Sequence, residues 1–526
     1  TEPQRRMADA WAVVLGTDAC ALGPDSNFFQ LGGDSLLSLR LLAEAQRRGM
    51  RLSIRRIFEA PTIRELASEQ PDLYAMHGLS RKAPMESSLF EVVHAPNDPH
   101  ACFPLVGITR AYFVGLHLSE FSLGMNPQIY FEWTWHERID VVRLQAALDA
   151  FIAHHPTWRA VVTSDGMMRV LERVPACEVR CETPHASASE AQLLSTRTQM
   201  VENGPSPDTW PLFECRVSHL ADSRSVMHLC VSLFIMDGVS DLTLRRQLSQ
   251  LYNEPETTLP HVELLYKDYC LSLAGANGSA GLAASPEHVA AKAFWSERVR
   301  RLPPPPELPM LISHDAHHRP SGKFRHVGAV LSADLFASLK ARCAERSVTP
   351  TSVMLTIYSL VLARFARHKR FLLNVLHCLR HPVHDDVSRV IGNFSSSFLL
   401  EADMQAPSSV LGHVRHVTQE LTTDLENACV SGVEVMEQYN QVHSQVGSAV
   451  APFVFVSAMG LEHVLDDWRE LNFVETHVQE ATPGSYMVNA VKEYPDGRLM
   501  WLLEVMDGLF PPAVVSGMLT MYERLL

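Results

Sequence analysis

Two short stretches of this chain place hydroxyl and carboxylate groups at spacings that could support chemistry. The first is Gly32-Gly33-Asp34-Ser35, which precedes an apolar run with helical periodicity. The glycines allow a tight, exposed turn, and the free N–H groups at a helix start favour a negatively charged group on a hydroxyl there. Ser35 is therefore a candidate attachment site. The alternative is that Asp34 or Ser35 only caps the helix, since both residue types are favoured at that position.

The second stretch contains Ser232, Asp237 and Ser240. Residues 228–236 predict a buried strand, and Asp237 with Gly238 predicts the turn between that strand and a following helix. A carboxylate and a hydroxyl that meet at such a turn could act on a substrate. The alternative is that Asp237 pairs with an arginine and that Ser240 caps the helix.

Several amphipathic segments surround Ser35. Helical spacing predicts helices over residues 3–16, from 36 to 49, over 54–58 and around 63–66. Four short helices within residues 1–70 predict a small all-α bundle.

The string FFQLGGDSLLSLR at positions 28–40 resembles the attachment motif of acyl and peptidyl carrier proteins. The helices around it match that family over the whole segment. The resemblance implies that Ser35 carries a covalently attached 4′-phosphopantetheine, which a phosphopantetheinyl transferase adds. The thiol of that group would hold an acyl intermediate as a thioester.

The remaining residues predict a larger α/β unit behind a linker. Residues 71–100 mix polar residues, proline and glycine without sustained periodicity, as linkers do. Beyond them, apolar runs such as 452–457 alternate with amphipathic helical patterns such as 144–154 and 351–367.

A second break divides this α/β unit into two lobes. Glycine and serine are frequent from 275 to 285, and four consecutive prolines at 303–306 predict a stiff, extended piece. We therefore expect an N-lobe over 101–270, and a connection with the C-lobe over 271–526.

Four separated strings in the two lobes resemble the condensation superfamily, and specifically its heterocyclization branch. They are FPLVGITRAYFVGL at 103–116, AHHPTWRAVVTSDGMMRVLERVP at 153–175, HPVHDDVSRVIGNFSSSFLLEAD at 381–403 and MDGLFPPAVVSGMLTMYERLL at 506–526. The resemblance implies two chloramphenicol-acetyltransferase-like halves that form a V around a central tunnel, with Asp237 and Ser240 near it. The whole chain then looks like part of a nonribosomal peptide synthetase, a transferase or ligase of secondary metabolite biosynthesis.

The chain departs from this branch at its first motif, DxxxxDxxS. Asp237 and Ser240 match the motif, but Ser232 stands at the position of the first aspartate. Leu233 occupies the place where ordinary condensation domains have a catalytic histidine. This motif therefore supplies no imidazole base.

The chain also departs from the branch where ring closure is carried out. In the family that the chain resembles, a threonine and an aspartate are held to catalyse cyclodehydration. The matching positions here hold Val456 and Val488. Valine can neither transfer a proton nor form a hydrogen bond, so we expect cyclodehydration to be lost. Ser457 and Asn489, which follow the two valines, are candidate replacements.

Four histidines are further candidate bases: His154, His155, His228 and His377. A lone histidine in such a context is more often a packed or surface residue than a base. None of the four has metal-ligand spacing with a partner, so no metal site is predicted.

Three functions remain open at this point. The domain could join an upstream acyl group to an amine without cyclising, it could catalyse a different reaction such as β-elimination in the same tunnel, or it could be a silent docking module. In each case the partners implied are upstream and downstream synthetase domains, other carriers, and acyl or aminoacyl thioesters.

Composition excludes some other classes. The net charge of −14 and the pI near 6.0 argue against nucleic-acid binding. Ten cysteines without CxxC pairs favour free thiols and a cytoplasmic protein. We find no apolar run long enough to span a bilayer, so no membrane partner is expected. The absence of an initiator methionine suggests a piece of a longer polypeptide.

Overall fold

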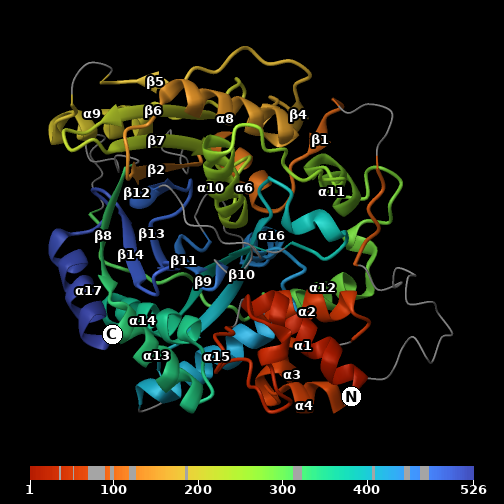
Figure 1. Ribbon diagram of the computed structural model, residues 1–526. Helices are drawn as coiled ribbons and strands as arrows, with labels where there is room; N and C mark the ends of the chain where they lie inside the picture. Colours follow the sequence, from red (N-terminus) through yellow and green to blue (C-terminus); the bar gives the residue numbers. More distant parts are fainter. Residues whose placement is uncertain are drawn as a thin grey trace.

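Figure 1 shows the computed structural model of the chain. The structure describes residues 1–34, 37–50, 52–68, 89–94, 100–117, 126–183, 187–311, 323–378, 380–405, 409–443, 450–461 and 473–526. The predicted attachment residue Ser35 and most of the predicted linker therefore lie outside the described residues.

The N-terminal unit is a helix bundle with a core of its own. Its helices are α1 (Glu2–Leu15), α2 (Leu37–Arg47), α3 (Ile54–Glu59) and α4 (Ile63–Ser68). The rings of Trp11 and Phe28 pack edge to face at 5.3 Å in the centre of this core. A Cβ at position 33 would come within 2.4 Å of the Phe28 ring, so the chain needs a glycine there to pass so close to its core.

The first large sheet has five strands in the order β12-β2-β7-β6-β5. The strands are β12 (Phe473–Ala481), β2 (Gln128–Trp135), β7 (Ser225–Ser232), β6 (Phe213–His219) and β5 (Arg180–Cys181). Helices α8 (Val141–His154), α9 (Glu190–Glu202) and α10 (Gly238–Asn253) pack around it (Figure 1). Beside this sheet lie α6 (Gly107–His117), α11 (Tyr266–Leu273) and a small sheet of β1 (Phe103–Pro104), β4 (Met167–Val170) and β3 (Ala160–Val162).

The second large sheet has six strands in the order β10-β9-β11-β13-β14-β8. The strands are β10 (Ser395–Asp403), β9 (Arg370–Cys378), β11 (Phe453–Ala458), β13 (Met487–Glu493), β14 (Leu499–Met506) and β8 (Phe324–Leu331). The three central strands β9, β11 and β13 run parallel, and the outer pairings are antiparallel.

Six helices accompany the second sheet. They are α12 (Pro286–Arg298), α13 (Ala333–Glu345), α14 (Pro350–Phe365), α15 (Val410–Glu426), α16 (Gly432–His443) and α17 (Pro512–Leu525). Helix α14 is apolar nearly all round and is buried between this sheet and its neighbouring helices, as expected for a central core helix.

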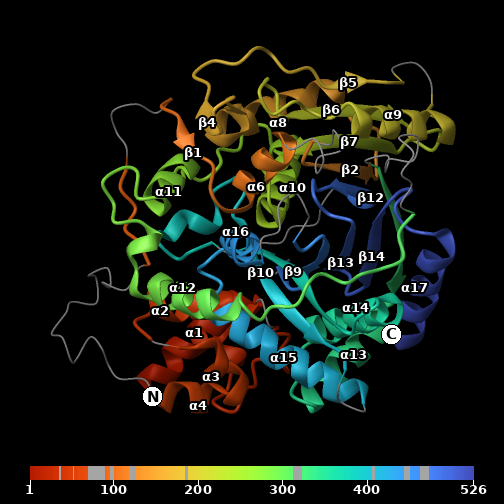
Figure 2. The ribbon, with the colours of Figure 1, turned by 180° about the vertical axis from the view of Figure 1, so that it is seen from behind.

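One strand departs from the predicted division of the lobes at residue 270. Strand β12 belongs to the second half of the sequence but pairs antiparallel with β2 of the first half. Figure 1 and Figure 2 both place it between β2 and the strands β13 and β14. The physical reason is that β2 would otherwise be an open sheet edge, which proteins tend to cover. The two lobes therefore share a strand.

The predicted strand over 228–236 is shorter than expected. Strand β7 ends at Ser232, and residues 233–236 continue as a buried turn. A short apolar run cannot by itself distinguish a strand from another buried conformation, which explains the difference.

A buried ion network ties the two sheets together. Arg245 on α10 forms ion pairs with Asp241 and with Glu475 on β12. Lys492 on β13 donates to the Glu475 carboxylate at 2.8 Å. Although burial opposes ionisation, Lys492 and Arg245 lower the pKa of Glu475 to about 2. A charged glutamate therefore joins α10, β12 and β13.

All ten cysteines are free thiols, as the sequence predicts. Among the described residues, no single helix has the length and apolar composition needed to cross a membrane. Helices α13 and α14, which are bent relative to each other, meet these two criteria only when they are taken as a pair.

Candidate functional site

The residues on either side of position 35 contact the second half of the chain. The Asp34 carboxylate accepts one hydrogen bond from the Leu37 N–H at 2.7 Å and another from the Thr351 hydroxyl on α14 at 2.8 Å. Leu37 packs against Gly460, where an added Cβ would come within 2.7 Å of the leucine side chain. Asp34 thus caps α2, as one sequence-based alternative held, and also anchors the bundle to the C-lobe.

Further contacts hold the helix bundle in this position. Arg47 donates to the carbonyl of His384 at 3.3 Å, and the N–H of Arg55 donates to the Glu426 carboxylate at 3.0 Å. Ile54 is buried in the hydrophobic core of the C-lobe. Figure 1 shows the bundle beside α12 and α15. The bundle is therefore held against the C-lobe by contacts of α2 and α3 and by Asp34.

A cavity of about 1100 Å³ lies between the bundle and the two lobes. Its wall includes Arg40 and Arg47 of the bundle, Val239 at the start of α10, and Cys378 and Arg380 of the C-lobe. The volume is at the upper end of the range of small-molecule sites. The cavity reaches from the middle of α2 to the junction of the lobes.

Asp237 lies at that junction and is fully engaged by protein groups. Its carboxylate accepts hydrogen bonds from the backbone N–H of Ser240 at 2.7 Å, from Arg380 at 2.8 Å and from the N–H of Phe394 at 3.1 Å. The Asp237 side chain has no exposed area, and that of Arg380 is 8% exposed. The arginine pairing that the sequence offered as an alternative for Asp237 is present.

The expected helix cap at Ser240 is wrong, because Asp237 caps α10. The Ser240 hydroxyl donates a hydrogen bond to the carbonyl of Gly392 at 2.7 Å. It also accepts a hydrogen bond from the backbone N–H of the same glycine at 3.1 Å. Ser240 thus ties the N-lobe helix to a C-lobe loop. Ser232 is buried at the end of β7, and its hydroxyl donates to the Pro127 carbonyl and accepts a hydrogen bond from the Phe234 N–H, both at 3.4 Å.

Val456 and Val488 lie on one face of the second sheet. Val456 is opposite Ala490, and Val454 is opposite Val488, in the parallel pairing of β11 with β13. Paired residues share a face and successive residues alternate, so the two valines are diagonal neighbours on the same side. The positions that the family uses for ring closure are therefore adjacent here, and both are apolar.

Ser457 and Asn489 lie on the opposite face, toward the helices. The Ser457 hydroxyl is 3.4 Å from that of Thr351 on α14. The Asn489 side-chain amide donates a hydrogen bond to the Leu502 carbonyl at 3.0 Å. Its oxygen accepts a hydrogen bond from the hydroxyl of Tyr522 on α17, also at 3.0 Å. Neither side chain adjoins the two valines, so the alternation of the strands separates these candidates from the positions they were expected to replace.

The four candidate histidines are kept neutral by burial. Burial lowers the pKa of His155 and of His228 to about 4 and that of His377 to about 3. It also lowers the pKa of His154. His155 contacts Gln247, and the ring of His377 packs on Phe398. All four thus have the packed roles that isolated histidines usually have.

Three residues that sequence reasoning missed lie on strands of the two sheets, and at least two of them are only half-buried: Glu480 on β12, Glu504 on β14 and His326 on β8. His326 Nε2 lies 3.3 Å from Glu504 Oε1, and Glu504 is 5% exposed. The Thr482 hydroxyl donates to Glu480 Oε1 at 3.1 Å. The available signal was a glutamate inside the otherwise apolar string LLEVM at 502–506.

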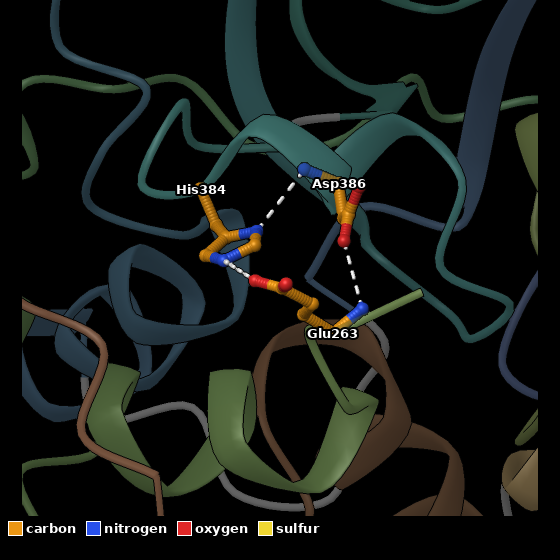
Figure 3. A group of neighbouring side chains, drawn as sticks. All are labelled: Glu263, His384 and Asp386. Atoms are coloured by element: carbon orange, nitrogen blue, oxygen red, sulfur yellow. Dashed lines mark hydrogen bonds and ion pairs between the residues drawn. The ribbon is translucent and has the colours of Figure 1, made fainter. Parts of the chain in front are cut away.

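A further cluster of Glu263, His384 and Asp386 has the composition of a metal site (Figure 3). His384 Nδ1 accepts the N–H of Asp386 at 3.1 Å, so the neutral ring keeps its proton on Nε2, the atom that faces Glu263. Asp386 is also ion-paired with Arg389 and accepts the N–H of Glu263 at 2.8 Å. The imidazole of His384 therefore has no free lone pair to bind a cation. The cluster instead stabilises the loop that contains His384, whose carbonyl accepts a hydrogen bond from Arg47.

Family models match both units of the chain. The Condensation domain model matches residues 104–493, and the model of the Phosphopantetheine attachment site matches residues 5–69.

Similar proteins are large synthetases. Phenyloxazoline synthase MbtB of Mycobacterium sp. (strain MCS) is 26% identical over 518 residues, which is 96% of this chain and 42% of that protein. Bacitracin synthase 1 of Bacillus licheniformis is 26% identical over 534 residues, which is 99% of this chain and 10% of that protein. The chain thus spans less than half the length of these relatives.

The fold is also that of a solved synthetase domain. The EpoB cyclization-docking bidomain of Sorangium cellulosum superposes with a TM-score of 0.70 and 28% identity, over 82% of this chain and 86% of that one. The α/β architecture of the two lobes that the sequence predicts is therefore confirmed, as is the assignment of the chain to nonribosomal peptide synthetases.

Proposed function

The chain belongs to the condensation-domain family and carries a phosphopantetheine attachment domain before it, and from this premise we propose that it joins two carrier-bound substrates without closing a ring. An acyl group held as a thioester on the phosphopantetheine of Ser35 is the donor. The amine of an amino acid on a second carrier is the acceptor. The domain is thus a heterocyclization-type domain that has kept amide formation and lost cyclodehydration.

The observation that carries this proposal is the position of the attachment segment. Asp34 and Leu37, which flank Ser35 and Leu36, are bound to Thr351 and Gly460 of the C-lobe. The same unit borders the cavity of about 1100 Å³ that extends to Arg380 at the lobe junction. We propose that an arm on Ser35 reaches this cavity, whose volume is large enough for an acyl chain.

The chemistry of amide formation suits a site with few reactive groups. The amine nitrogen attacks the thioester carbonyl, the C–N bond forms, the C–S bond breaks, and the nitrogen proton leaves while the thiolate is protonated. Positioning of the two reactants supplies much of the rate enhancement in such reactions. Ring closure needs in addition an acid and a base to expel water. The paired valines at 456 and 488 supply neither.

The partners and location follow from this function. A phosphopantetheinyl transferase must modify Ser35, and neighbouring synthetase domains must load the donor and deliver the acceptor. We place the protein in the cytoplasm, without nucleic-acid or membrane partners. Its ten free thiols and its net charge of −14 support this assignment.

The mass of the product after a single turnover tests the proposal. The chain is converted to its phosphopantetheine form, loaded with candidate acyl groups, and mixed with carriers that hold Cys, Ser or Thr. We expect an amide on the acceptor carrier. A product lighter by one further water would contradict the loss of cyclodehydration, and no product with any substrate pair would indicate a silent docking domain.

Ser35→Ala is the matched control for the carrier. The variant should keep the thermal unfolding curve of the wild type and gain no phosphopantetheine mass when it is incubated with coenzyme A and a broad-specificity transferase. Modification of this variant at an unchanged level would overturn the assignment of Ser35.

A further inference from the structure

A second cavity, of about 240 Å³, is lined by residues of β1, β4, the end of α8 and the start of α11. It is separate from the large cavity, although Val262 lines both. Phe103 and Val390 belong to the apolar part of its wall and are buried. His261 also lines it and is exposed, so the cavity borders solvent. The proposed acyl transfer makes no use of this space.

The charged part of this wall is cationic. Lys267 lines the cavity and is 3% exposed, which places its ammonium group inside the protein. The half-buried Arg159 donates from Nη1 to the carbonyls of Ile152 and Ala153 at 2.7 and 3.1 Å, and it forms no ion pair with any described residue. The described residues of the wall include no aspartate or glutamate. Two cations without a carboxylate in the wall favour a negatively charged occupant.

Imidazole rings complete the polar part of the wall. They are those of His100, His154, His155 and His261. The Nε2 atom of His154 is buried and has no hydrogen-bond partner among the described residues, whereas Nε2 of His155 lies 2.5 Å from the side-chain oxygen of Gln247. Burial lowers the pKa of His154, so its ring is neutral at pH 7, and an anion beside it would favour the protonated form. His154 therefore offers a contact that the described part of the protein does not itself satisfy.

A metal ion suits this wall less well than an organic anion does. A metal site brings at least three ligand atoms close together. Among the described residues, that holds only for the cluster of Glu263, His384 and Asp386. His100 is already engaged, because its Nδ1 lies 3.0 Å from the Val170 carbonyl. An organic anion would use the cations for its charge and the apolar part of the wall for its hydrocarbon body.

The wall of the small cavity also contacts the loop that joins the lobes. The hydroxyl of Thr157, a wall residue, donates to the Ile391 carbonyl at 2.8 Å. The residue after Ile391 forms both hydrogen bonds with Ser240 of α10. Tyr266, another wall residue, donates to the Asn393 carbonyl at 2.6 Å. A molecule packed against this wall would therefore stabilise the contact between α10 and the C-lobe.

We propose that the small cavity binds a small organic carboxylate with an apolar body, that Arg159, Lys267 and His154 hold its carboxylate group, and that its binding stabilises the junction of the lobes. The cavity of about 240 Å³ has the volume of roughly eight water molecules at ~30 Å³ each, which is room for a short branched or cyclic acid. This ligand is not the thioester on Ser35, so the inference does not depend on the proposed acyl transfer.

Calorimetric titration of the full, unloaded chain tests the inference. The probes are 3-methylbutanoate, cyclopentanecarboxylate and benzoate. We expect saturable binding of at least one of them at one site per chain, with a rise in the midpoint of thermal unfolding, because a ligand of the folded state stabilises it. The neutral amide of that acid should bind about tenfold more weakly or worse, because it lacks the charge. No saturable binding of any probe would overturn the inference, and so would equal affinity for the amide or for inorganic phosphate.

Two variants locate the site. Arg159→Gln should weaken binding by about tenfold or more, since it removes a charged donor. Val170→Phe changes no charge and should abolish binding, because the larger ring occupies the cavity. Arg173→Gln is the matched control for the lost charge, and it should bind as the wild type does because Arg173 is exposed and outside the wall. Thermal unfolding confirms that each variant folds. Unchanged affinity in Arg159→Gln or Val170→Phe would overturn the location.

Proton uptake gives a readout that a change of packing alone would not produce. Arg159 and Lys267 stay charged near neutral pH, so uptake must occur on imidazoles of the wall. Titrations at pH 7 in two buffers of different ionisation enthalpy should show that the wild type takes up protons when the acid binds. The uptake should be smaller in His154→Gln, where the rings of His155 and His261 remain. An uptake of the same size in this variant would refute the contact with His154.

Discussion

Asp237 is buried at the junction of the lobes and Glu480 is half-buried near the end of β12, and the two carboxyl groups have opposite surroundings. Asp237 accepts three hydrogen bonds, one of them from the buried guanidinium of Arg380. Glu480 accepts one from Thr482 and faces a second carboxylate across the boundary of the two sheets. Asp237 thus has a cationic partner, whereas burial and Glu504 raise the pKa of Glu480.

The difference shows that agreement with a motif and chemical readiness are separate properties. Asp237 belongs to the string that resembles a family motif, and its contacts are those of a structural clamp between α10 and the loop at 392–394. Glu480 belongs to no motif in our sequence analysis, yet its surroundings shift its pKa upward. The comparison can be tested by changing each group and measuring both stability and rate.

The largest effect on stability is expected for Asp237→Ala. The change leaves the Arg380 guanidinium buried without its counter-ion and removes the cap of α10. Such losses cost about 3–5 kcal/mol of the free energy of unfolding, measurable by urea denaturation. Asp237→Asn, which keeps the shape, should lose less. If Asp237→Ala kept the stability of the wild type and lost only activity, the contrast with Glu480 would be broken.

A smaller effect of opposite sign is expected for Glu480→Gln. The pKa of Glu480 is raised from 4.5 to about 7 by folding, so the folded chain retains a proton that the unfolded chain releases between these values. Wild-type stability should therefore fall as the pH rises from 4.5 to 7, by about 2 kcal/mol after allowance for partial solvent access. The glutamine variant should lack this loss and be more stable than the wild type at pH 8. Equal pH dependence in both proteins would contradict the contrast.

The smallest effect is expected on the far face of β13, for Tyr522→Phe. The variant loses the hydroxyl that donates to Asn489 at 3.0 Å, which should cost about 1 kcal/mol of stability in thermal unfolding. Because Asn489 faces α17, the rate of amide formation should not change. A slower rate would mean that Asn489 takes part in the chemistry after all.

The sequence predicts the architecture well because most elements have strong local signals. The helices around Trp11 and Leu144 and the strand of Phe455 follow clear apolar periodicities, and each forms at or close to its expected position. The exchange of β12 between lobes could not be predicted, since strand pairing depends on contacts between residues 128–135 and 473–481, which lie far apart in the sequence.

The candidate site was predictable only in part. The attachment motif and the two valines can be read from strings, because a family motif fixes residue types along the chain. The alternation that turns Ser457 and Asn489 away from the valines follows from strand assignment, which the sequence offered for 452–457 but not for 487–493. The meeting of Glu480 with Glu504 joins two sheets, so no local pattern could reveal it.

The strand that the lobes share has a consequence for motion within the molecule. Because β12 is hydrogen-bonded to one sheet and covalently continuous with the other, the halves cannot separate without bending this segment. Any opening would also change the gap between the carboxyls of Glu480 and Glu504, which are mounted on different sheets. The electrostatic interaction between the two carboxyl groups would change with that gap.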